Sequence, residues 1–429
     1  MSTSKIKPVY VIDGSRTPFI KSKGKPGPFS ASDMAVYAGR DLLTRLQIDP
    51  TLIGESIIGC MMPSEHEANI GRLIGLRLGM GDKTPGWTVQ RNCASGMQSL
   101  DSAIKDIQIG RHDLVLAGGT EAMSRAPLTL RPKMVAWLAD LNRAKTPLGK
   151  LGVLTKLKLS YLAPIITLIH GLTDPLYGVN MGQTAEILAY DFDITRQEMD
   201  EFALRSQLLA AEATEAKLYQ NMVAIYDHQG NFYDRDTGVR ADSTIEALAK
   251  LKPFFDRKFG RVTAGNSSQI SDGAAILLLA SEEAVVKHDL KPLGKIVDVE
   301  WGALSPEVMG LGPVIASTPI LQRQGMGLND IDYWEINEAF AAQVLGCLRA
   351  WESDKFCRQH FNCDALGSLD QNRLNINGGA IALGHPVGAT GSRLVLQLLS
   401  ILERENARRG IATLCIGGGQ GGAMMVERV

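Results

Sequence analysis

Two stretches far apart in this chain share one order of features, and this repeat constrains the fold more than any other feature. In residues 93–123, CASGMQSL is followed by DLVLAGGTEAM, and in residues 388–424, GATGSRLV is followed by ATLCIGGGQGGAM. Each stretch has a small-residue A-[ST]-G turn, an amphipathic helix pattern, and a strand that runs into glycines. We infer an internal duplication of one α/β unit, although such turns also recur in α/β proteins without duplication.

The spacing inside the two stretches supports this interpretation. Gly118 lies 22 residues after Gly96, and Gly417 lies 26 residues after Gly391. The four extra residues fit inside the polar loop ERENARRG of the second stretch. Two similar halves would leave a cleft between them, and ligands usually bind in such clefts.

Strand-like runs alternate with helical periodicity at both ends of the chain, which predicts an α/β fold with helices packed on a sheet. We expect residues 1–125 to form an N-terminal half, completed by about 271–292. Residues 293–429 form the C-terminal half. Between them, residues 126–270 have long helical segments and few strands, and we expect an inserted loop domain there.

The first part of the insert, residues 126–175, is a basic amphipathic segment. From Arg125 to His170 there are eight Lys or Arg residues and one acid, Asp140, in a chain whose formal net charge is −1. Leu, Val, Ile and Trp137 lie among the cations. The pattern is typical of a surface that meets anionic lipid or a partner, and a solvated helical excursion covering the site explains it equally well.

Charge and apolar content favour a cytoplasmic protein that does not bind nucleic acid. A net charge of −1 predicts no basic face for nucleic acid. The start, MSTSKIKP, lacks the apolar core of a signal peptide, and the longest apolar run, near 159–172, is shorter than the about 20 residues of a membrane span. Six cysteines without regular spacing are typical of free thiols in a reducing compartment.

Cys93 stands where a strand-like run gives way to a helix, and the small residues Ala94, Ser95 and Gly96 follow it. Backbone N–H groups at a helix N-terminus stabilise a thiolate, so we expect the thiol pKa to be lower than its usual value near ~8.5. The small neighbours leave room for a carbonyl group. A buried structural cysteine fits the position equally well, because cysteine is among the most buried residue types.

His385 lies in GGAIALGHPVGATG, where Gly384 and Pro386 restrict the turn. It stands just ahead of the second duplicated helix, as Cys93 stands ahead of the first. The two helix ends would therefore face one cleft with an imidazole and a thiol. An imidazole can take the thiol proton and so activate a cysteine nucleophile.

Cys415 lies at a strand end and is followed closely by the glycines 417–419. The backbone N–H groups of these glycines could bind an oxyanion, and the thiol could deliver or remove a proton. The run also contains G-x-G-x-x-G, but only seven residues follow Gly422, whereas a dinucleotide site needs a complete βαβ unit. The sequence has no G-x-x-x-x-G-K-[ST] phosphate loop.

Three smaller sets of residues could contribute to a site. NEAFAAQ places the neutral Asn337, which can hold a water or a carbonyl, at a strand end. TAGNSSQISDGAA, residues 263–275, is a polar loop suited to hydrogen-bonding an extended ligand that carries amides. Cys357, His360 and Cys363 have a spacing compatible with zinc, but a fourth ligand is missing nearby, so we expect no metal.

Taken in order, these blocks resemble the thiolases, the family of 3-ketoacyl-CoA thiolases and acetyl-CoA acetyltransferases. The similar blocks span nearly the whole chain: NCASGMQS, GGTEAMS, MGQTAE, TAGNSSQISDGAA, NEAFAAQ, GGAIALGHPVGATG and CIGGGQGGAM. The resemblance implies two similar αβα halves that form a five-layer αβαβα core, with a loop domain inserted in the first half.

The resemblance also implies a ping-pong acyl transfer through an acyl-thioester on Cys93. His385 matches the base that activates this cysteine, and Cys415 matches the second acid/base, which protonates the departing acetyl-CoA carbanion. Asn337 matches the residue that holds a water which, with His385, stabilises the thioester enolate oxygen. The backbone N–H groups of Cys93 and Gly417 match the second oxyanion hole.

Coenzyme A and acyl-CoA are the implied substrates, without a bound cofactor. The residues that fall where the family contacts the coenzyme A arm or its thioester end are Ser268, Arg240, Met181, Met309 and Phe340. Ketoacyl synthases, which decarboxylate malonyl thioesters, resemble this chain less, because they carry a second histidine where it has Cys415. A non-catalytic member of the fold would often lack the nucleophile, which this chain keeps.

The basic segment bears on the subclass. It looks like the longer loop of the β-subunits of fatty-acid-oxidation trifunctional complexes. That resemblance implies a medium- or long-chain 3-ketoacyl-CoA substrate, a hydratase/dehydrogenase α-subunit partner and peripheral membrane contact through 126–175, besides a homodimer or homotetramer. GHPVGATG is closer to the general thiolases, so a short-chain acetyl-CoA C-acetyltransferase making acetoacetyl-CoA stays the alternative.

Overall fold

The structure, a computed structural model that describes residues 7–429, has one large mixed sheet made of two matching parts. The N-terminal part consists, in spatial order, of β1 (Val9–Arg16), β10 (Ser271–Ser281), β5 (Leu114–Ala122), β3 (Glu55–Gly59) and β4 (Gly86–Val89), with β2 (Ile20–Lys21) paired to β10. The C-terminal part consists of β11 (Gly294–Ala303), β14 (Gln420–Arg428), β13 (Arg409–Ile416) and β12 (Tyr333–Ile336).

The two parts repeat one pairing pattern, which confirms the internal duplication. Starting from β1, the successive strand pairs are antiparallel, antiparallel and parallel, and the same order holds starting from β11. The parts are joined where β1 pairs with β11 at Tyr10↔Lys295 and Val11↔Gly294. The sheet is therefore continuous across this seam.

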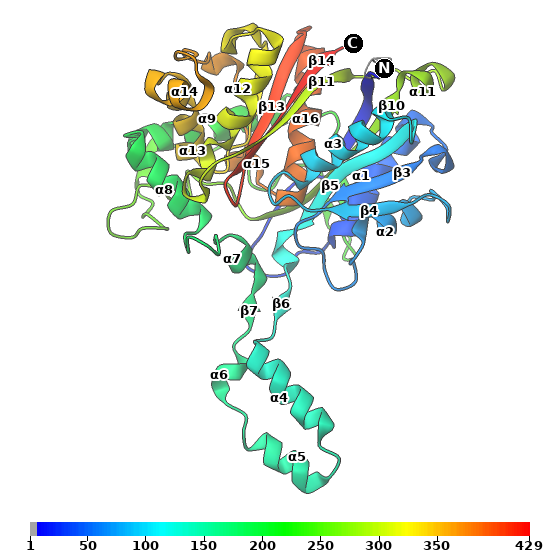
Figure 1. Cartoon of the computed structure of the whole chain (residues 1–429), viewed down its shortest axis with the longest axis vertical. Coiled ribbons are helices and arrows are strands. Elements are labelled where there is room, and N and C mark those ends of the chain that lie inside the picture. The colour runs from blue at the N-terminus through cyan, green and yellow to red at the C-terminus, as the bar shows by residue number, and fades with distance from the viewer. Residues whose placement is uncertain (1–6) are drawn as a thin grey trace.

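Helices lie between and outside the two parts of the sheet (Figure 1). The central layer is α3 (Ser95–Gln108) and α16 (Val387–Arg404), which pack on each other and on strands of both parts. The outer layers are α1 (Ala31–Leu46) and α2 (Ile70–Arg77) on the N-terminal part, and α12 (Gly312–Gln324) and α13 (Ala341–Trp351) on the C-terminal part. This arrangement confirms the five expected layers.

Small residues allow the two central helices to start against each other. A Cβ atom on Gly96 would lie 2.7 Å from the carbonyl oxygen of Gly388, and one on Gly391 would lie 2.5 Å from the backbone nitrogen of Met97. These distances are shorter than any real carbon contact, so larger side chains would separate the helices. The glycines of the repeated turns therefore bring the segments of Cys93 and His385 to one place.

Several shorter elements surround this core. They are α8 (Met181–Asp191), α9 (Arg196–Glu215), β8 (Ile225–Tyr226), β9 (Phe232–Tyr233), α10 (Ile245–Ala249), α11 (Glu282–Lys287), α14 (Asp354–Phe361) and α15 (Ala380–Leu383). The elements from α8 to α10 belong to the insert, which occupies the connection from β5 to β10. In the C-terminal half, the equivalent connection from β13 to β14 is only the turn through glycines 417–419.

The basic segment forms an arm that projects from the layered core (Figure 1). Its stalk is the antiparallel pair β6 (Leu128–Thr129) and β7 (Ile165–Ile166). Beyond the stalk are α4 (Pro132–Arg143), α5 (Pro147–Leu154) and α6 (Leu159–Leu162), and α7 (Thr167–Gly171) returns to the core. These four helices contain no buried residue. The arm extends away from the core, so it does not fit an excursion that covers the site.

Within residues 7–429, no helix is both long and apolar enough to cross a bilayer. Residues 1–6, part of the segment considered as a signal peptide, lie outside the described part of the chain. The domain limits at 125, 270 and 292 stay predictions.

Candidate active site

Cys93 lies in the turn between β4 and α3, two residues before the helix begins at Ser95. The Ser95 hydroxyl accepts the N–H of Arg91 at 2.9 Å and donates to the carbonyl of Asn92 at 2.7 Å, which closes the turn. Asn92 has a left-handed backbone, with φ of 44°, a conformation that asparagine tolerates better than most residues. The thiol is thus held on a tight, partly exposed turn.

The electrostatic surroundings of Cys93 differ from our expectation. Burial of its sulfur raises the thiol pKa above the ordinary value. The backbone N–H groups of Gly417 and of Cys93 itself act on the sulfur in the opposite direction, but their effect is smaller. The prediction of a lowered pKa was therefore wrong. The resting group is a neutral thiol, which needs a base before it can act as a nucleophile.

Cys415 lies near Cys93 although it comes from the other half. It is the penultimate residue of β13, pairs with Gly421, and is 1% exposed. Burial raises the pKa of Cys415 well above its usual value, and the neighbouring sulfurs, Cys93 first, raise it further. The Asn92 amide donates to the carbonyl of Gly417 at 2.8 Å, which ties the Cys93 turn to the glycine turn after Cys415.

The glycine turn joins two antiparallel strands, β13 and β14. Gly418 and Gly419 have φ of 89° and 76°, which L side chains rarely adopt. The G-x-G-x-x-G pattern therefore belongs to a hairpin, and it is not part of a dinucleotide-binding βαβ unit.

His385 lies just ahead of α16 and has one ring nitrogen engaged. Its Nδ1 atom lies 2.7 Å from the Thr390 hydroxyl, which donates its own hydrogen to the carbonyl of Pro386 at 2.9 Å. The hydroxyl can therefore only accept from the ring, so Nδ1 carries the proton. Among the described residues, the buried Nε2 atom has no hydrogen-bond partner. The Nε2 lone pair is available as a base.

Burial, and then the positive charge of Arg393, lower the pKa of His385 to about 3. Arg393 is itself buried, and its Nη1 atom lies 2.9 Å from Glu335. The imidazole is therefore neutral at physiological pH and can accept a proton from the thiol. The resting site holds a neutral thiol and a neutral imidazole instead of an ion pair.

The polar loop 263–275 holds the His385 turn from one side. The N–H of His385 donates to the carbonyl of Gln269 at 3.2 Å, and the Gln269 amide donates to the carbonyl of Ile381 at 3.0 Å. Gly384 has φ of 106°, and a Cβ atom there would lie 2.2 Å from the Ser271 hydroxyl. Only glycine fits at this position, so the loop and the glycine together fix the ring's place.

Asn337 directly follows β12 and is fully buried. Its N–H donates to Thr413, two residues before Cys415 in β13. Neither amide atom of its side chain finds a hydrogen-bond partner within residues 7–429. A buried amide without partners costs about 1–3 kcal/mol, so this side chain suits a bound water or substrate carbonyl.

Two buried carboxylates support the site, and neither was assigned a role from the sequence. Glu121 of β5 accepts the N–H groups of Met61 at 2.8 Å, Met62 at 3.0 Å and Gly388 at 3.1 Å. It thus links both halves beside Cys93 and His385. Burial raises the pKa of Glu121 to about 7. A carboxylate inside a strand of nine buried residues was the signal that could have revealed it.

The second carboxylate is Glu338, next to Asn337. It accepts hydrogen bonds from Ser206 at 2.6 Å, Asn375 at 2.8 Å and the N–H of Ile381 at 3.2 Å. Glu338 therefore holds the segment that leads to the His385 turn.

Four of the five predicted substrate-binding residues lie on the Cys415 side. Met309 and Phe340 are buried in the same apolar cluster as Cys415, and Met181, the first residue of α8, packs on it beside Gly417. Ser268 adjoins them, because its N–H donates to the carbonyl of the residue before Phe340, at 2.9 Å. These residues form one wall next to the Cys415 thiol.

Arg240 lies elsewhere, on the exposed surface. Its N–H donates to Gln207 at 2.8 Å. Lys21 of β2 is close to it: burial lowers the pKa of Lys21, and the charge of Arg240 lowers it further. The half-buried Lys21 and the exposed Arg240 form a cation pair that suits a phosphate group, and Lys21 was not predicted from the sequence.

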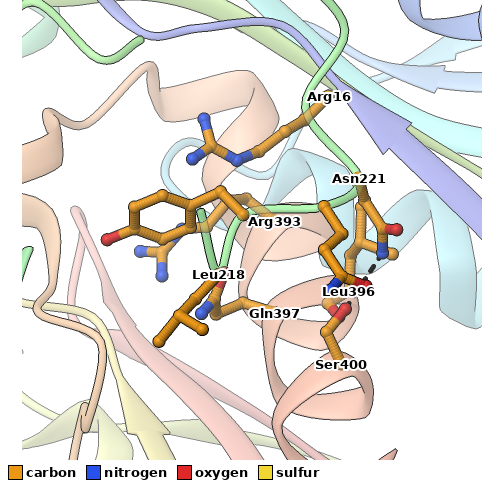
Figure 2. Close-up of a pocket in the computed structure, with 9 residues that line it drawn as sticks. Arg16, Leu218, Asn221, Arg393, Leu396, Gln397 and Ser400 are labelled. Atoms are coloured by element: carbon orange, nitrogen blue, oxygen red, sulfur yellow. Dashed lines mark hydrogen bonds between the residues drawn. The ribbon is translucent and has the colours of Figure 1, made fainter. Parts of the chain in front are cut away.

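A small enclosed cavity between α16 and residues 218–221 is not a substrate site. Figure 2 shows Arg16, Asn221, Arg393 and Ser400 around it. Its volume of about 10 Å³ accommodates only about one water molecule. Within residues 7–429, no group of three or more His, Cys, Asp or Glu side chains is arranged to hold a metal ion.

Comparisons with known sequences identify the family. Residues 9–283 match the family described as "Thiolase, N-terminal domain", and residues 290–428 match "Thiolase, C-terminal domain". The chain belongs to the thiolase family. It is therefore an acyltransferase, and the family resemblance inferred from the sequence is confirmed.

Relatives cover the thiolase along its whole length. The 3-ketoacyl-CoA thiolase of Colwellia psychrerythraea is 36% identical over 431 residues, which cover 100% of this chain and 98% of the relative. The mitochondrial trifunctional enzyme subunit beta of Bos taurus is 36% identical over 424 residues, covering 98% of this chain and 88% of the relative.

Solved structures resemble the thiolase equally well. Human mitochondrial 3-ketoacyl-CoA thiolase superposes with a TM-score of 0.84 at 34% identity and covers 99% of this chain and 100% of its own. An acetyl-CoA acetyltransferase of Bacillus anthracis gives the same TM-score and identity, with 99% of each chain covered. The names of these neighbours leave the acyl chain length open.

Proposed function

We propose that this thiolase splits 3-ketoacyl-CoA with coenzyme A into acetyl-CoA and a shortened acyl-CoA, or runs the reverse condensation, through an acyl-thioester on Cys93. The observation that carries the proposal is that Cys93 lies beside Cys415 and packs on the cluster of Val387, two residues after His385. The neighbouring Cys93 raises the pKa of Cys415, and the Nε2 atom of His385 has no hydrogen-bond partner in the described residues.

In the first step, His385 Nε2 takes the proton of Cys93 as the sulfur attacks the ketone carbon of the substrate. The bond between the second and third acyl carbons breaks, and its electron pair goes to the second carbon. Cys415 protonates that carbon, which releases acetyl-CoA. The raised pKa of Cys415 suits this role, because the group stays protonated until it is needed.

In the second step, the Cys415 thiolate takes the proton of an incoming coenzyme A thiol. The new thiolate attacks the thioester, and Cys93 leaves and regains its proton from His385. Every group then has its starting proton. The cycle uses only these side chains and two coenzyme A molecules, so no further cofactor is required.

Two sets of donors stabilise the oxygen atoms that become negative. The N–H groups of Cys93 and Gly417, which act on the Cys93 sulfur at rest, suit the oxygen of the group attached to it. Asn337, through a water, and His385 suit the enolate oxygen of acetyl-CoA. The buried, unpartnered amide of Asn337 supports this assignment.

Coenzyme A is assigned to the Cys415 side of the site. Met181, Met309 and Phe340 suit its thioester end, and Ser268 suits an amide of its arm. The cation pair of Arg240 and Lys21 suits its phosphates, because phosphate affinity for Arg and Lys is largely electrostatic.

We favour medium- and long-chain substrates of fatty-acid β-oxidation, with short-chain synthesis of acetoacetyl-CoA as the alternative. Steady-state rates on acetoacetyl-CoA and 3-ketohexadecanoyl-CoA decide between them. A higher kcat/KM on the long substrate supports the proposal, and comparable values on both contradict the preference. If the protein cleaves neither substrate, the proposed function itself is contradicted.

We further propose that the arm binds an anionic surface, either membrane phospholipid or a hydratase/dehydrogenase α-subunit. Leu148 and Leu159 are 80% and 86% exposed, so the arm presents large apolar side chains that the core does not cover. Between its helices is a cavity of about 590 Å³, lined by Trp137, Tyr161 and three cations, with Asp140 as the only acid. Apolar and cationic groups side by side are typical of surfaces that meet lipid headgroups or acidic partners.

Two further parts of the proposal are the oligomeric state of the thiolase and its location in the cell. A homodimer or homotetramer is expected, and light scattering of the purified protein measures it. We place the thiolase in the cytoplasm, because the proposed chemistry requires Cys93 and Cys415 as reduced thiols.

A further inference from the structure

A small apolar cluster borders Cys93 on the side that faces the arm. Its buried members are Met62, Met123 and Val387, and the partly buried residues that pack on it are Met61, Cys93, Ala126 and Leu168. We call this set, without Cys93 itself, the methionine cluster. Nothing in the mechanism above uses its side chains.

Four different segments contribute to the methionine cluster. Met61 and Met62 follow β3, Met123 follows β5, Val387 begins α16 two residues after His385, and Leu168 lies in α7, where the arm returns to the core. The cluster therefore lies where the two halves and the arm meet, directly beside the proposed nucleophile.

The backbone of this cluster is fixed, while its side chains are adaptable. Glu121 accepts the N–H groups of Met61 and Met62 and also that of Gly388, next to Val387. Methionine has three rotatable bonds and a polarisable sulfur, so it fits irregular or variable apolar groups. A fixed frame with flexible apolar side chains suits aliphatic chains of different lengths.

The surroundings of the Cys93 sulfur differ from one side to another. On the polar side are the N–H of Gly417 and the thiol of Cys415. On the inner side is the filled core around Ala94 and Met97, which are fully buried. The methionine cluster is apolar and partly open to solvent, and Cys93 packs directly on it.

We propose that the acyl chain carried on Cys93 lies over the methionine cluster and makes this cluster the determinant of chain length. The proposal rests on the proposed function, because it needs an acyl group on Cys93. The chain is held there by its covalent bond, so the cluster needs only to cover it, and each methylene that loses water contributes to binding.

The apolar surface continues outward from the cluster. Leu128 and Ile166 face each other across the stalk and are 65% and 43% exposed, and Ile169 follows in α7. A chain that extends past Leu168 therefore meets further apolar side chains. This continuity favours linear, medium- and long-chain acyl groups over short or polar ones.

Narrowing the cluster with a bulky side chain tests the proposal. The variants Met61→Trp and Leu168→Trp change two separate segments at partly exposed positions. We expect the ratio of kcat/KM for 3-ketohexadecanoyl-CoA to that for acetoacetyl-CoA to fall about tenfold or more in each. The control is Ile109→Trp, which adds the same ring at an exposed position beyond the far end of α3 and leaves the ratio unchanged.

A ratio that stays within about twofold of wild type in both cluster variants overturns the acyl-chain site while leaving the proposed function intact. Failure of the wild-type protein to cleave any 3-ketoacyl-CoA overturns both. An independent measurement uses the wild-type chain and a long-chain 3-ketoacyl-CoA that carries a terminal diazirine. Photolysis should label peptides containing residues 61–62, 123–126 or 165–172, and labelling confined to other peptides contradicts the proposal.

Discussion

The Nδ1 atom of His385 lies 2.7 Å from the Oγ1 atom of Thr390, and that hydroxyl already donates its hydrogen to Pro386. One short side chain thus determines the tautomer of the ring. It places the ring proton on Nδ1 and leaves the Nε2 lone pair for the thiol. The fold supplies this partner within the first turns of α16, so the base and its orienting group move together.

Removing the orienting hydroxyl should impair catalysis without changing the fold. Thr390→Val keeps the volume but frees the ring to adopt the other tautomer, so we expect kcat for thiolysis to fall roughly 10²-fold. Thr390→Ser restores the hydroxyl and should recover most of the rate. Equal kcat values in the wild-type and valine proteins would show that the tautomer is not fixed by this contact.

The two cysteines should be separable by half-reaction. In Cys415→Ala, thiolysis should fall about 10²-fold or more, because a carbanion needs an acid to leave. Transfer of the acetyl group from acetyl-CoA to Cys93 should persist, since a coenzyme A thiolate can leave unprotonated. Radiolabelled acetyl-CoA measures this transfer. Loss of labelling along with thiolysis would show that Cys415 is indispensable for acyl transfer to Cys93 as well, and not only for protonating the carbanion.

Glu121 should make stability depend on pH. Its folded pKa of about 7 is above the ordinary unfolded value of about 4.3, so the folded state binds more protons between these values. Its contribution is fully present below about pH 4.3 and is lost as the pH rises through about 7, at up to about 1.4 kcal/mol per unit. Glu121→Gln should lack this slope in urea unfolding at pH 5, 6 and 7.5. Parallel curves for the two proteins would contradict the assignment.

Charge reversal on the arm should weaken its binding to an anionic surface. In the variant Lys150→Glu with Lys156→Glu, cosedimentation with vesicles containing phosphatidylserine should fall, at about 1 kcal/mol per cation removed. Lys287→Glu in α11, on the core, is the control and should bind as wild type. If the wild-type protein does not bind vesicles but binds the α-subunit through the arm, the partner of the arm is the α-subunit and not the membrane.

Local patterns were enough to predict the repeated α/β unit, and the resemblance to the thiolases implied the five layers. The helix after Cys93 keeps its predicted apolar face, and Met97, Leu100 and Ile104 are all buried. Likewise, the turns before α3 and α16 are equivalent, as their shared small residues indicate. These features depend on residues close in the chain, where spacing alone carries the information.

Features that depend on distant segments were not predictable in this way. The pKa of Cys93 rises because other segments bury its sulfur, and helix position alone suggested the reverse. The tie made by Glu121 depends on Met61 and Gly388, which are far from it in the chain. The direction of the arm depends on what its stalk packs against. Each of these three features can be predicted only when the tertiary structure is known.

Trapping the acyl-enzyme tests the central claim most directly. The thiolase is incubated with a 3-ketoacyl-CoA in the absence of free coenzyme A, digested, and its peptides are weighed by mass spectrometry. We predict release of acetyl-CoA and one shortened acyl group on the peptide that contains Cys93, absent in Cys93→Ala and retained in a Cys363→Ala control. An acyl group on another residue, or thiolysis by the Cys93→Ala protein, would contradict the account.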